Sequence, residues 1–367
     1  MNAPRVATFL DLPAGSPGGS VELFLDLYTG SSPLIPARAF MLKPAGRTPA
    51  APAGLDLLAV SGKCLDGTAF GHYVRALHKA LVAVVDPAAI EVLHLQHLAF
   101  GATPALLRAL PEHPRIALVY GTDLLFAETH RDQLWILRES TRLADAIVVP
   151  TGAMADRLMR LAPRTDRRKI QRIAWGIPDH LLAARAPARP PRQPGQALRL
   201  LYAGRLTAEK GGEQLVKAVS AIRGVDLSIA APRHEFHALS HLLNRLGVQA
   251  RYLGWLRRPQ LWKAFAEHDV LVMPSTTLEA MGLVALEAQA SDLPVLYQPV
   301  PGLRDTLGAS ALATDFTNPR VIARDLERIK SSPSLLSALR AAGRANAARF
   351  PLSATAAALT DLGKHLV

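Results

Sequence analysis

Short apolar runs typical of β-strands alternate with helix-like segments along almost the whole chain, and this alternation limits the fold more than any other feature. A strand, a crossover helix and a second strand form the unit from which parallel sheets are built. The pattern therefore predicts an α/β protein. The expected strands of the first half are residues 5–12, 37–44, 55–62, 90–97, 115–122, 146–151 and 170–175.

The same pattern restarts in the second half, and the two halves are separated by the segment AARAPARPPRQPGQ. Its prolines remove backbone donors and stiffen the chain, so it is a linker rather than an element. A chain of 367 residues is also too long for one ordinary core. We expect an N-terminal Rossmann-like domain at residues 1–185, a linker at 186–196 and a second such domain at 197–350.

Helices are expected between the strands of both halves. The expected helices are residues 71–85, 104–110, 133–143, 153–161, 212–222, 234–246, 259–266 and 283–290. The expected strands of the second half are residues 198–204, 225–231, 250–255, 270–274 and 293–298. Doubly wound sheets bind ligands at the carboxyl ends of their strands, so we expect the site in the cleft between the two domains.

The composition describes a globular protein rather than a membrane-spanning or disulfide-bonded one. Hydrophobic residues make up 49% of the chain and charged residues 20%. No apolar run reaches the ~18–20 residues that a membrane span requires. Cys64 is the only cysteine, which excludes an intramolecular disulfide, and the first residues do not resemble a secretory signal. We expect a cytoplasmic protein.

The net charge of +12 is concentrated in one stretch. Residues 163–193 hold eight basic residues against two acidic ones, a net of +6. This stretch could be a solvated hinge, or it could attract nucleotide phosphates, nucleic acid or an anionic membrane surface. Aromatic residues are only 5% of the chain, and basic and aromatic residues do not interleave as in a base-stacking platform. We therefore expect no nucleic-acid partner and leave peripheral membrane contact and oligomeric state open.

The strand at 198–204 ends in the motif GRLTAEKGG, which contains Arg205 and Lys210. From a strand end, the planar fork of Arg205 and the mobile charge of Lys210 could both reach one diphosphate and neutralise it without a metal ion. The glycines that follow, Gly211 and Gly212, allow close backbone approach. An ordinary strand–loop–helix turn with exposed basic residues is the alternative.

Two carboxylates eight positions apart, Glu279 and Glu287, follow the strand at 270–274. Glu287 falls on the expected helix, where a carboxylate suits bidentate hydrogen bonding to the two ribose hydroxyls. Glu279 precedes the helix and could accept hydrogen bonds from sugar hydroxyls. The backbone N–H groups of Gly282 and Leu283 at the helix start would face an anion. The alternatives are a loop-tethering role for Glu279 and an exposed helix position for Glu287.

Taken together, these motifs resemble those of the retaining GT-B glycosyltransferases of the GT4 family, the glycosyl transferases group 1. The likeness is strongest in GRLTAEKG and in the E-x7-E pair, and it extends weakly to GSPGGSVE, YGTD, ADAIVVPTGAMADRL and WGIPD. The resemblance implies the GT-B fold, in which two doubly wound Rossmann-like domains face an interdomain cleft. It also implies that a C-terminal helix at 351–367 crosses back to the first domain.

The resemblance implies a role for each matching residue. Arg205 and Lys210 would contact the donor diphosphate, Glu279 the donor sugar and Glu287 the ribose. The predicted catalytic residues are Arg205, Lys210 and Glu279. The predicted donor-binding residues are Gly18, Gly19, Gly204, Arg205, Lys210, Arg233, Leu253, Glu279, Met281, Gly282, Leu283 and Glu287, with Gly18 and Gly19 in the loop between the first strand and the first helix.

Three positions are expected on the acceptor and sugar side: His97, Tyr120 and Asp123. The family often carries a histidine where this chain has Tyr120, and a phenol cannot do the acid–base chemistry of an imidazole at neutral pH. The usual Gly-x-Gly turn of the second domain is replaced by Ala-Ala-Pro, so Arg233 could take over a contact. The histidine pair in HLQH lacks the acidic neighbours of a zinc site, which favours a structural or acceptor-lining role.

These observations predict an enzyme that moves a sugar from a nucleotide diphosphate sugar to a hydroxyl or amine of a small-molecule acceptor, with the anomeric configuration retained. No Asp-x-Asp pair occurs in the chain, so we expect no metal and no other cofactor. The alternatives are a sugar-nucleotide epimerase or phosphorylase of the same fold, transfer to a lipid or glycan acceptor at a membrane surface, and a non-catalytic protein that binds through residues 163–193.

Overall fold

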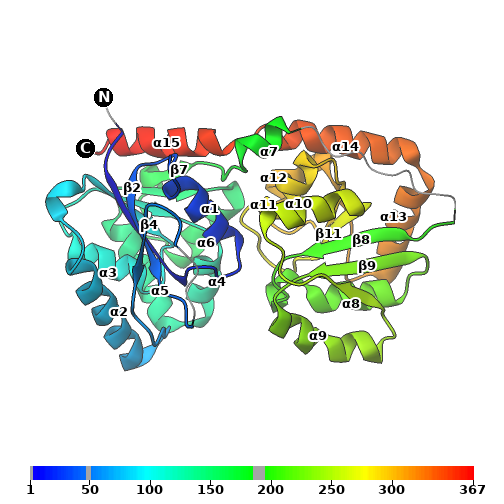
Figure 1. Cartoon of the computed structure of the whole chain (residues 1–367), viewed down its shortest axis with the longest axis horizontal. Coiled ribbons are helices and arrows are strands. Elements are labelled where there is room, and N and C mark those ends of the chain that lie inside the picture. Colours follow the sequence, from blue (N-terminus) through cyan, green and yellow to red (C-terminus); the bar gives the residue numbers. More distant parts are fainter. Residues whose placement is uncertain (1–2, 47–50, 185–194) are drawn as a thin grey trace. The chain divides into compact units, whose positions relative to one another are not determined.

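A computed structural model describes residues 3–46, 51–184 and 195–367 of the chain (Figure 1). These residues fall into two units. Unit 1 consists of Met1–Trp175 together with Leu352–Val367, and unit 2 consists of Gly176–Pro351. The boundary lies at Trp175 rather than at residue 185. Most of the predicted linker, residues 186–194, lies outside the described residues.

Unit 1 is built on a seven-stranded parallel sheet with the strand order β3-β2-β1-β4-β5-β6-β7. Its strands are β1 (Val6–Pro13), β2 (Ala37–Leu42), β3 (Leu55–Leu58), β4 (Val92–Gln96), β5 (Arg115–Leu118), β6 (Ala146–Val149) and β7 (Ile170–Arg172). Its helices are α1 (Gly19–Tyr28), α2 (Gly67–Val82), α3 (Ala102–Ala109), α4 (Thr122–Thr129), α5 (Arg131–Leu143), α6 (Gly152–Leu161) and α15 (Leu352–Lys364), with 3-10 turns η1 (Pro87–Ala89) and η2 (Arg167–Lys169).

The last helix of the chain, α15, belongs to unit 1 although unit 2 precedes it in sequence (red in Figure 1). It buries Leu352, Ala356 and Leu359. Gly363 lies against Pro4, Val92 and Ile116, where an added Cβ would come within 3.1 Å of the proline ring. The Thr355 hydroxyl donates a hydrogen bond to the Ala174 carbonyl at 2.8 Å. The apolar face of α15 therefore completes the core at β4 and β5.

Unit 2 is built on a six-stranded parallel sheet with the order β10-β9-β8-β11-β12-β13. Its strands are β8 (Leu198–Ala203), β9 (Val225–Ala230), β10 (Ala250–Tyr252), β11 (Val270–Met273), β12 (Val295–Tyr297) and β13 (Leu312–Ala313). Its helices are α7 (Asp179–Ala183), α8 (Gly212–Ser220), α9 (Arg233–Arg245), α10 (Arg258–Glu267), α11 (Leu283–Ala290), α12 (Leu303–Leu307), α13 (Pro319–Ser331) and α14 (Pro333–Ala347), with 3-10 turns η3 (Ala208–Lys210) and η4 (Gly308–Ser310).

The strand order of each sheet reverses once, and this reversal locates the crevice of a doubly wound sheet. In unit 1 the order runs outward from β1 to β2 and β3 on one side, and from β4 to β7 on the other. In unit 2 it runs from β8 to β9 and β10, and from β11 to β13. The loops that follow β1 and β4, and those that follow β8 and β11, are therefore the expected ligand-binding loops.

The prediction of parallel α/β sheets is confirmed, and several element boundaries differ from those expected. Helix α11 begins and ends where the sequence predicted. The expected strand at 115–122 ends at Leu118, and its last residues instead lead into helix α4, which the strand pattern concealed because Val119 and Tyr120 are also buried. The short edge strand β13 was not expected, since two residues carry no periodicity.

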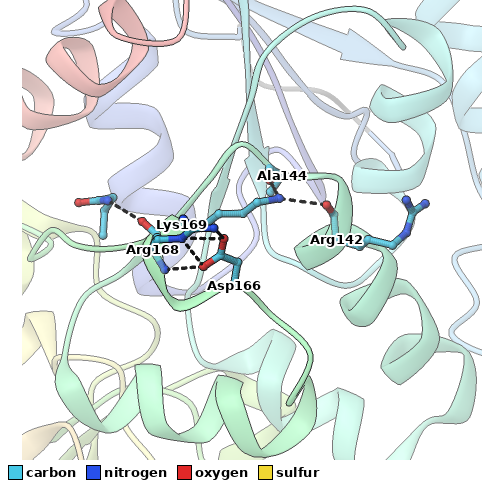
Figure 2. A network of polar contacts seen from close by, with 6 residues as sticks. Arg142, Ala144, Asp166, Arg168 and Lys169 are labelled. Atoms are coloured by element: carbon cyan, nitrogen blue, oxygen red, sulfur yellow. Dashed lines mark hydrogen bonds and ion pairs between the residues drawn. The ribbon is translucent and has the colours of Figure 1, made fainter.

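Within the basic stretch, Arg168 and Lys169 of unit 1 make the local contacts that Figure 2 shows. Arg168 forms an ion pair with Asp166 at 2.8 Å, and the Lys169 ammonium donates to the Ala144 and Arg142 carbonyls at 2.8 and 3.2 Å. Those carbonyls end helix α5, where a cation is favourable. Two of the basic residues therefore have a structural use. Arg185, Arg189 and Arg192 lie outside the described residues.

Within residues 3–46, 51–184 and 195–367, no helix is both long enough and apolar enough to cross a membrane.

Candidate active site

An ion pair joins the two loops at the switch point of the unit 2 sheet. Lys210 ends the η3 turn after β8, and Glu279 lies in the loop after β11. The Lys210 ammonium lies 2.5 Å from Glu279 Oε2, and the two side chains are 28% and 12% exposed. The Ser275 hydroxyl also donates to Glu279 Oε2 at 3.4 Å. The structure thus brings together one basic and one acidic member of the predicted catalytic set, at the strand ends where ligands bind.

Two glycines let these loops pack closely. Gly211 has a φ of +72°, and a Cβ there would lie 1.9 Å from the Pro274 carbonyl oxygen. Gly302 has a φ of +87°, and its Cβ would lie 1.7 Å from the Glu279 carbonyl oxygen. The sequence predicted that Gly211 serves close approach. The structure shows that the neighbour is the loop after β11, so the glycine fixes Lys210 relative to that loop.

Arg205 lies in the loop after β8, and hydrogen bonds from or to neighbouring side chains fix this loop. Its guanidinium is 3.8 Å from Glu209. The Tyr202 hydroxyl donates to the Arg205 carbonyl, and the Leu206 N–H donates to Glu235 Oε2 at 2.5 Å. Neither Tyr202 nor Glu235 was predicted. The available signal for Glu235 was an acidic residue in the first turn of the helix after the neighbouring strand.

Helix α11 directs its N-terminus into this region. Gly282 is its N-cap with a φ of +69°, Leu283 is its first residue, and Met281 is buried just before it. The first N–H groups of a helix lack intrahelical acceptors and carry a partial positive charge. The start of α11, beside the Lys210 ammonium, is therefore suited to an anion.

Glu287 lies on α11 but not on an exposed face. Its carboxylate contacts Arg258 Nε and Trp262 Nε1 of helix α10, both at 3.1 Å. The alternative that Glu287 is a solvated helix residue is wrong, because the residue is 4% exposed.

The remaining predicted donor residues of unit 2 follow neighbouring strands. Gly204 directly follows β8, and its N–H donates to the Ala230 carbonyl at 3.0 Å. Arg233 is the exposed first residue of α9, with its Nε 3.3 Å from His237. Leu253 follows β10, and its N–H donates to the Ile229 carbonyl at 2.9 Å. All three positions therefore lie at the carboxyl edge of the same sheet.

The predicted acceptor-side residues lie at the carboxyl ends of β4 and β5 in unit 1. The His97 ring contacts the Tyr120 ring at a centroid distance of 4.8 Å, and the Tyr120 hydroxyl donates to Gln96 at 2.6 Å. Burial, with the nearby charge of Lys63, lowers the pKa of His97 to about 3. The imidazole is therefore neutral at pH 7.

Asp123 has a structural use in this arrangement. Its carboxylate accepts hydrogen bonds from the backbone N–H groups of Leu98 at 2.9 Å and Leu124 at 3.1 Å. Burial raises the pKa of Asp123 to about 6, although these backbone hydrogen bonds oppose the rise. Asp123 thus ties the loop after β4 to the start of helix α4.

The first loop of unit 1 differs slightly from the prediction. Gly18 precedes α1 as its N-cap, but Gly19 is the first residue of the helix rather than part of the loop. Gly19 is exposed at this position.

Sequence reasoning missed a buried acid at this edge of unit 1. Asp11 of β1 is buried, forms an ion pair with Lys63 and accepts a hydrogen bond from the Gly101 N–H at 2.9 Å. Lys63 lies 4.9 Å from the Phe100 ring centroid. The only available signal was a charged residue within an apolar strand.

In the described ranges 3–46, 51–184 and 195–367, no three His, Cys, Asp or Glu side chains lie close enough together to hold a metal ion.

Residues 188–346, which include most of unit 2 and every candidate residue on it, match the family described as glycosyl transferases group 1. This region of the chain is therefore similar to that family.

Similarity to curated proteins covers a longer part of the chain. The D-inositol 3-phosphate glycosyltransferase of Streptomyces griseus is 30% identical over 266 residues, which are 67% of this chain and 54% of that protein. The chain spans about half the length of the first relatives it matches, for example 43% of the Thermobispora bispora protein.

Two solved structures share the fold of this chain along its length. Sucrose-phosphate synthase from Thermosynechococcus elongatus gives a TM-score of 0.78 with 18% identity over 99% of both chains. Anabaena HepE, solved in complex with UDP-glucose, gives a TM-score of 0.76 with 13% identity over 99% of this chain and 100% of that one. The predicted GT-B fold class is confirmed.

Proposed function

We propose that the chain transfers a glycosyl group from a nucleotide diphosphate sugar to a hydroxyl or amine of a small-molecule acceptor, with retention of configuration and without a metal ion. The observation that carries the proposal is the Lys210–Glu279 pair at the switch point of the unit 2 sheet. It sets a cation for the diphosphate beside a carboxylate for the sugar hydroxyls, at the start of α11.

The chemistry requires charge stabilisation more than a nucleophile. As the bond from the anomeric carbon to the diphosphate breaks, negative charge grows on the departing phosphate, and Arg205, Lys210 and the N-terminus of α11 offset it. The acceptor oxygen or nitrogen attacks the same face of the sugar, and its proton passes to the departing phosphate oxygen. We assign the acceptor or sugar side to His97 and Tyr120 of unit 1, with Asp123 holding their loops.

The comparisons support this proposal through the names of similar proteins. HepE of the same fold was solved with UDP-glucose, and the Streptomyces griseus relative is named for D-inositol 3-phosphate. UDP-glucose and D-inositol 3-phosphate are therefore the first donor and acceptor to assay. The single cysteine agrees with a cytoplasmic site of action.

The proposal is tested in two steps. Thermal shift with UDP-, GDP-, ADP- and TDP-sugars identifies the donor, because binding stabilises the folded state by mass action. Turnover with that donor and a panel of acceptors is then measured in the presence of EDTA, and product configuration is read from the anomeric proton coupling. We expect retained configuration and undiminished turnover in EDTA.

Lys210→Ala should lower turnover about a hundred- to a thousandfold, since one such donor to a developing negative charge contributes about 3 kcal/mol to the barrier. The matched control is Lys217→Ala, which removes an exposed ammonium of α8 that pairs with Glu213 at 3.3 Å. Near-normal turnover of a folded Lys210→Ala protein would contradict the role. Nucleotide release that needs no acceptor would instead indicate an epimerase or phosphorylase.

A further inference from the structure

The carboxylate of Glu287 is held by two donors on one face of helix α10. Arg258 Nε lies 3.1 Å from Glu287 Oε1, and Trp262 Nε1 lies 3.1 Å from Glu287 Oε2. Each carboxylate oxygen thus has its own partner, which fixes both the position of the group and its rotation about the last side-chain bond. A carboxylate this buried is stable in its ionised form only with such partners.

The spacing of the two donors explains how one helix supplies both. Arg258 and Trp262 are four residues apart, so they lie one turn apart on the same face of α10. The indole also contacts the His180 ring of α7, at a centroid distance of 5.4 Å. Helix α7 thus contacts α10 through Trp262, and α10 contacts α11 through Glu287.

We propose that Arg258 and Trp262 are positioning residues for recognition of the donor ribose by Glu287. This inference rests on the proposed function. A carboxylate has about four acceptor sites, so it can receive the two ribose hydroxyls in addition to these two donors. Arg258 places a positive charge beside the carboxylate and the Trp262 N–H fixes its plane, so that the acceptor sites lie at the spacing of a vicinal diol.

The inference predicts a loss of ribose selectivity rather than a general loss of binding. Calorimetry would first show which of UDP, GDP and ADP binds. The affinity of that nucleotide would then be compared with the affinity of its 2′-deoxy form. In the unaltered protein, we expect the ribonucleotide to bind about tenfold more tightly, as for a hydrogen bond to a charged group. In Trp262→Phe, which keeps the aromatic ring but loses the N–H, this preference should fall below about threefold.

A second variant and a matched control separate positioning from folding. Arg258→Lys keeps the charge but loses the fixed Nε–H, and it should also reduce the preference, so the test does not depend on the stability of one variant. Trp255→Phe is the control, because Trp255 is a 38% exposed tryptophan of the same unit. It should keep the full preference. In a Glu287→Gln background, Trp262→Phe should have no further effect on the preference.

The outcomes distinguish this inference from the proposed function. The inference is wrong if the unaltered protein binds a nucleotide without preferring the ribonucleotide. It is also wrong if the preference persists in both Trp262→Phe and Arg258→Lys. In either case the proposed diphosphate site is unaffected. If the unaltered protein binds none of the nucleotides, the proposed function is wrong and the inference is wrong with it.

Discussion

At the scale of single residues, the candidate site consists of charges that are already paired before a ligand arrives. Lys210 pairs with Glu279, Glu287 with Arg258, and Asp11 with Lys63. Pairing of this kind fixes side chains that would otherwise lose rotamer entropy on binding. A donor diphosphate would add a second acceptor to Lys210 without having to order it first.

His97 gives a residue-scale prediction for pH dependence. Its pKa falls from the ordinary 6.5 to about 3 because of burial and the Lys63 charge, so below pH 6.5 the unfolded chain takes up a proton that the folded chain does not. The contribution of His97 to the stability of unit 1 should therefore be full above pH 6.5 and decrease as the pH falls toward 3. His97→Asn should reduce this slope by about 1.4 kcal/mol per pH unit between pH 6 and 4.

Asparagine suits this test because the backbone at His97 has a φ of +72°, which asparagine tolerates. Urea unfolding at pH 4, 5, 6 and 7 would be followed by the tryptophan fluorescence of unit 1, from Trp135 and Trp175, with Trp255 and Trp262 of unit 2 replaced by phenylalanine. The control is His72→Asn at an exposed position of α2. Asp123 contributes a slope of opposite sign between pH 3.8 and about 6, which both proteins share. Equal slopes with and without His97 would contradict the prediction.

At the scale of elements, the site depends on how the loop after β11 packs against the turn before α12. The Glu279 N–H donates to the Pro301 carbonyl at 3.3 Å, and the next turn brings Gly302 against the Glu279 carbonyl. Neither loop has regular secondary structure, so their mutual contact sets the position of Glu279.

Gly302→Ala should therefore be severe. The added methyl group would collide with the Glu279 carbonyl, and the positive φ of Gly302 is itself costly for alanine. We expect more than about 3 kcal/mol of lost stability or a displaced Glu279 loop, with donor affinity lost in either case. Urea unfolding and calorimetry with the identified nucleotide would measure the two effects.

Gly308→Ala is the control for this prediction. Gly308 has a φ of +46° but nothing within 4 Å of its added Cβ, so it should cost only about 1–2 kcal/mol of backbone strain and leave nucleotide affinity unchanged. Similar losses of affinity in both variants would show that the contact with Glu279 is not what matters.

At the scale of the whole molecule, the chain leaves unit 1 at Trp175 and returns to it at Leu352. The folding of unit 1 therefore requires residues that are synthesised after unit 2. Such long sequence separations add loop-closure entropy to the folding of the first sheet.

Leu359→Ala tests this dependence. Leu359 is fully buried on α15, so we expect a loss of about 2–5 kcal/mol in unit 1. Hydrogen exchange should accelerate in β1, β4 and β5 while β8 and β11 of unit 2 keep their protection. Leu366→Ala, at a half-exposed position beyond α15, is the control and should change neither set. Acceleration in β8 and β11 alone would contradict the assignment of α15 to unit 1.

The sequence by itself determined the fold class, the positions of most strands along the chain, the bounds of α11 and the presence of two charged motifs. Each of these is encoded locally, because hydrophobic periodicity and glycine or proline positions act within a few residues. Strand β13 is too short to show a hydrophobic period. Helix α4 follows the buried strand β5 so closely that the apolar pattern does not show where the strand ends.

Only the tertiary structure decided which charges meet. Lys210 and Glu279 are 69 residues apart in sequence, Trp262 and Glu287 are 25 apart, and Leu206 and Glu235 are 29 apart. Whether such side chains touch depends on the packing of helices and loops against a completed sheet, which no local pattern records. The sequence therefore indicated a sugar-nucleotide site, and the fold decided that its two glutamates are held in place by Lys210, Arg258 and Trp262.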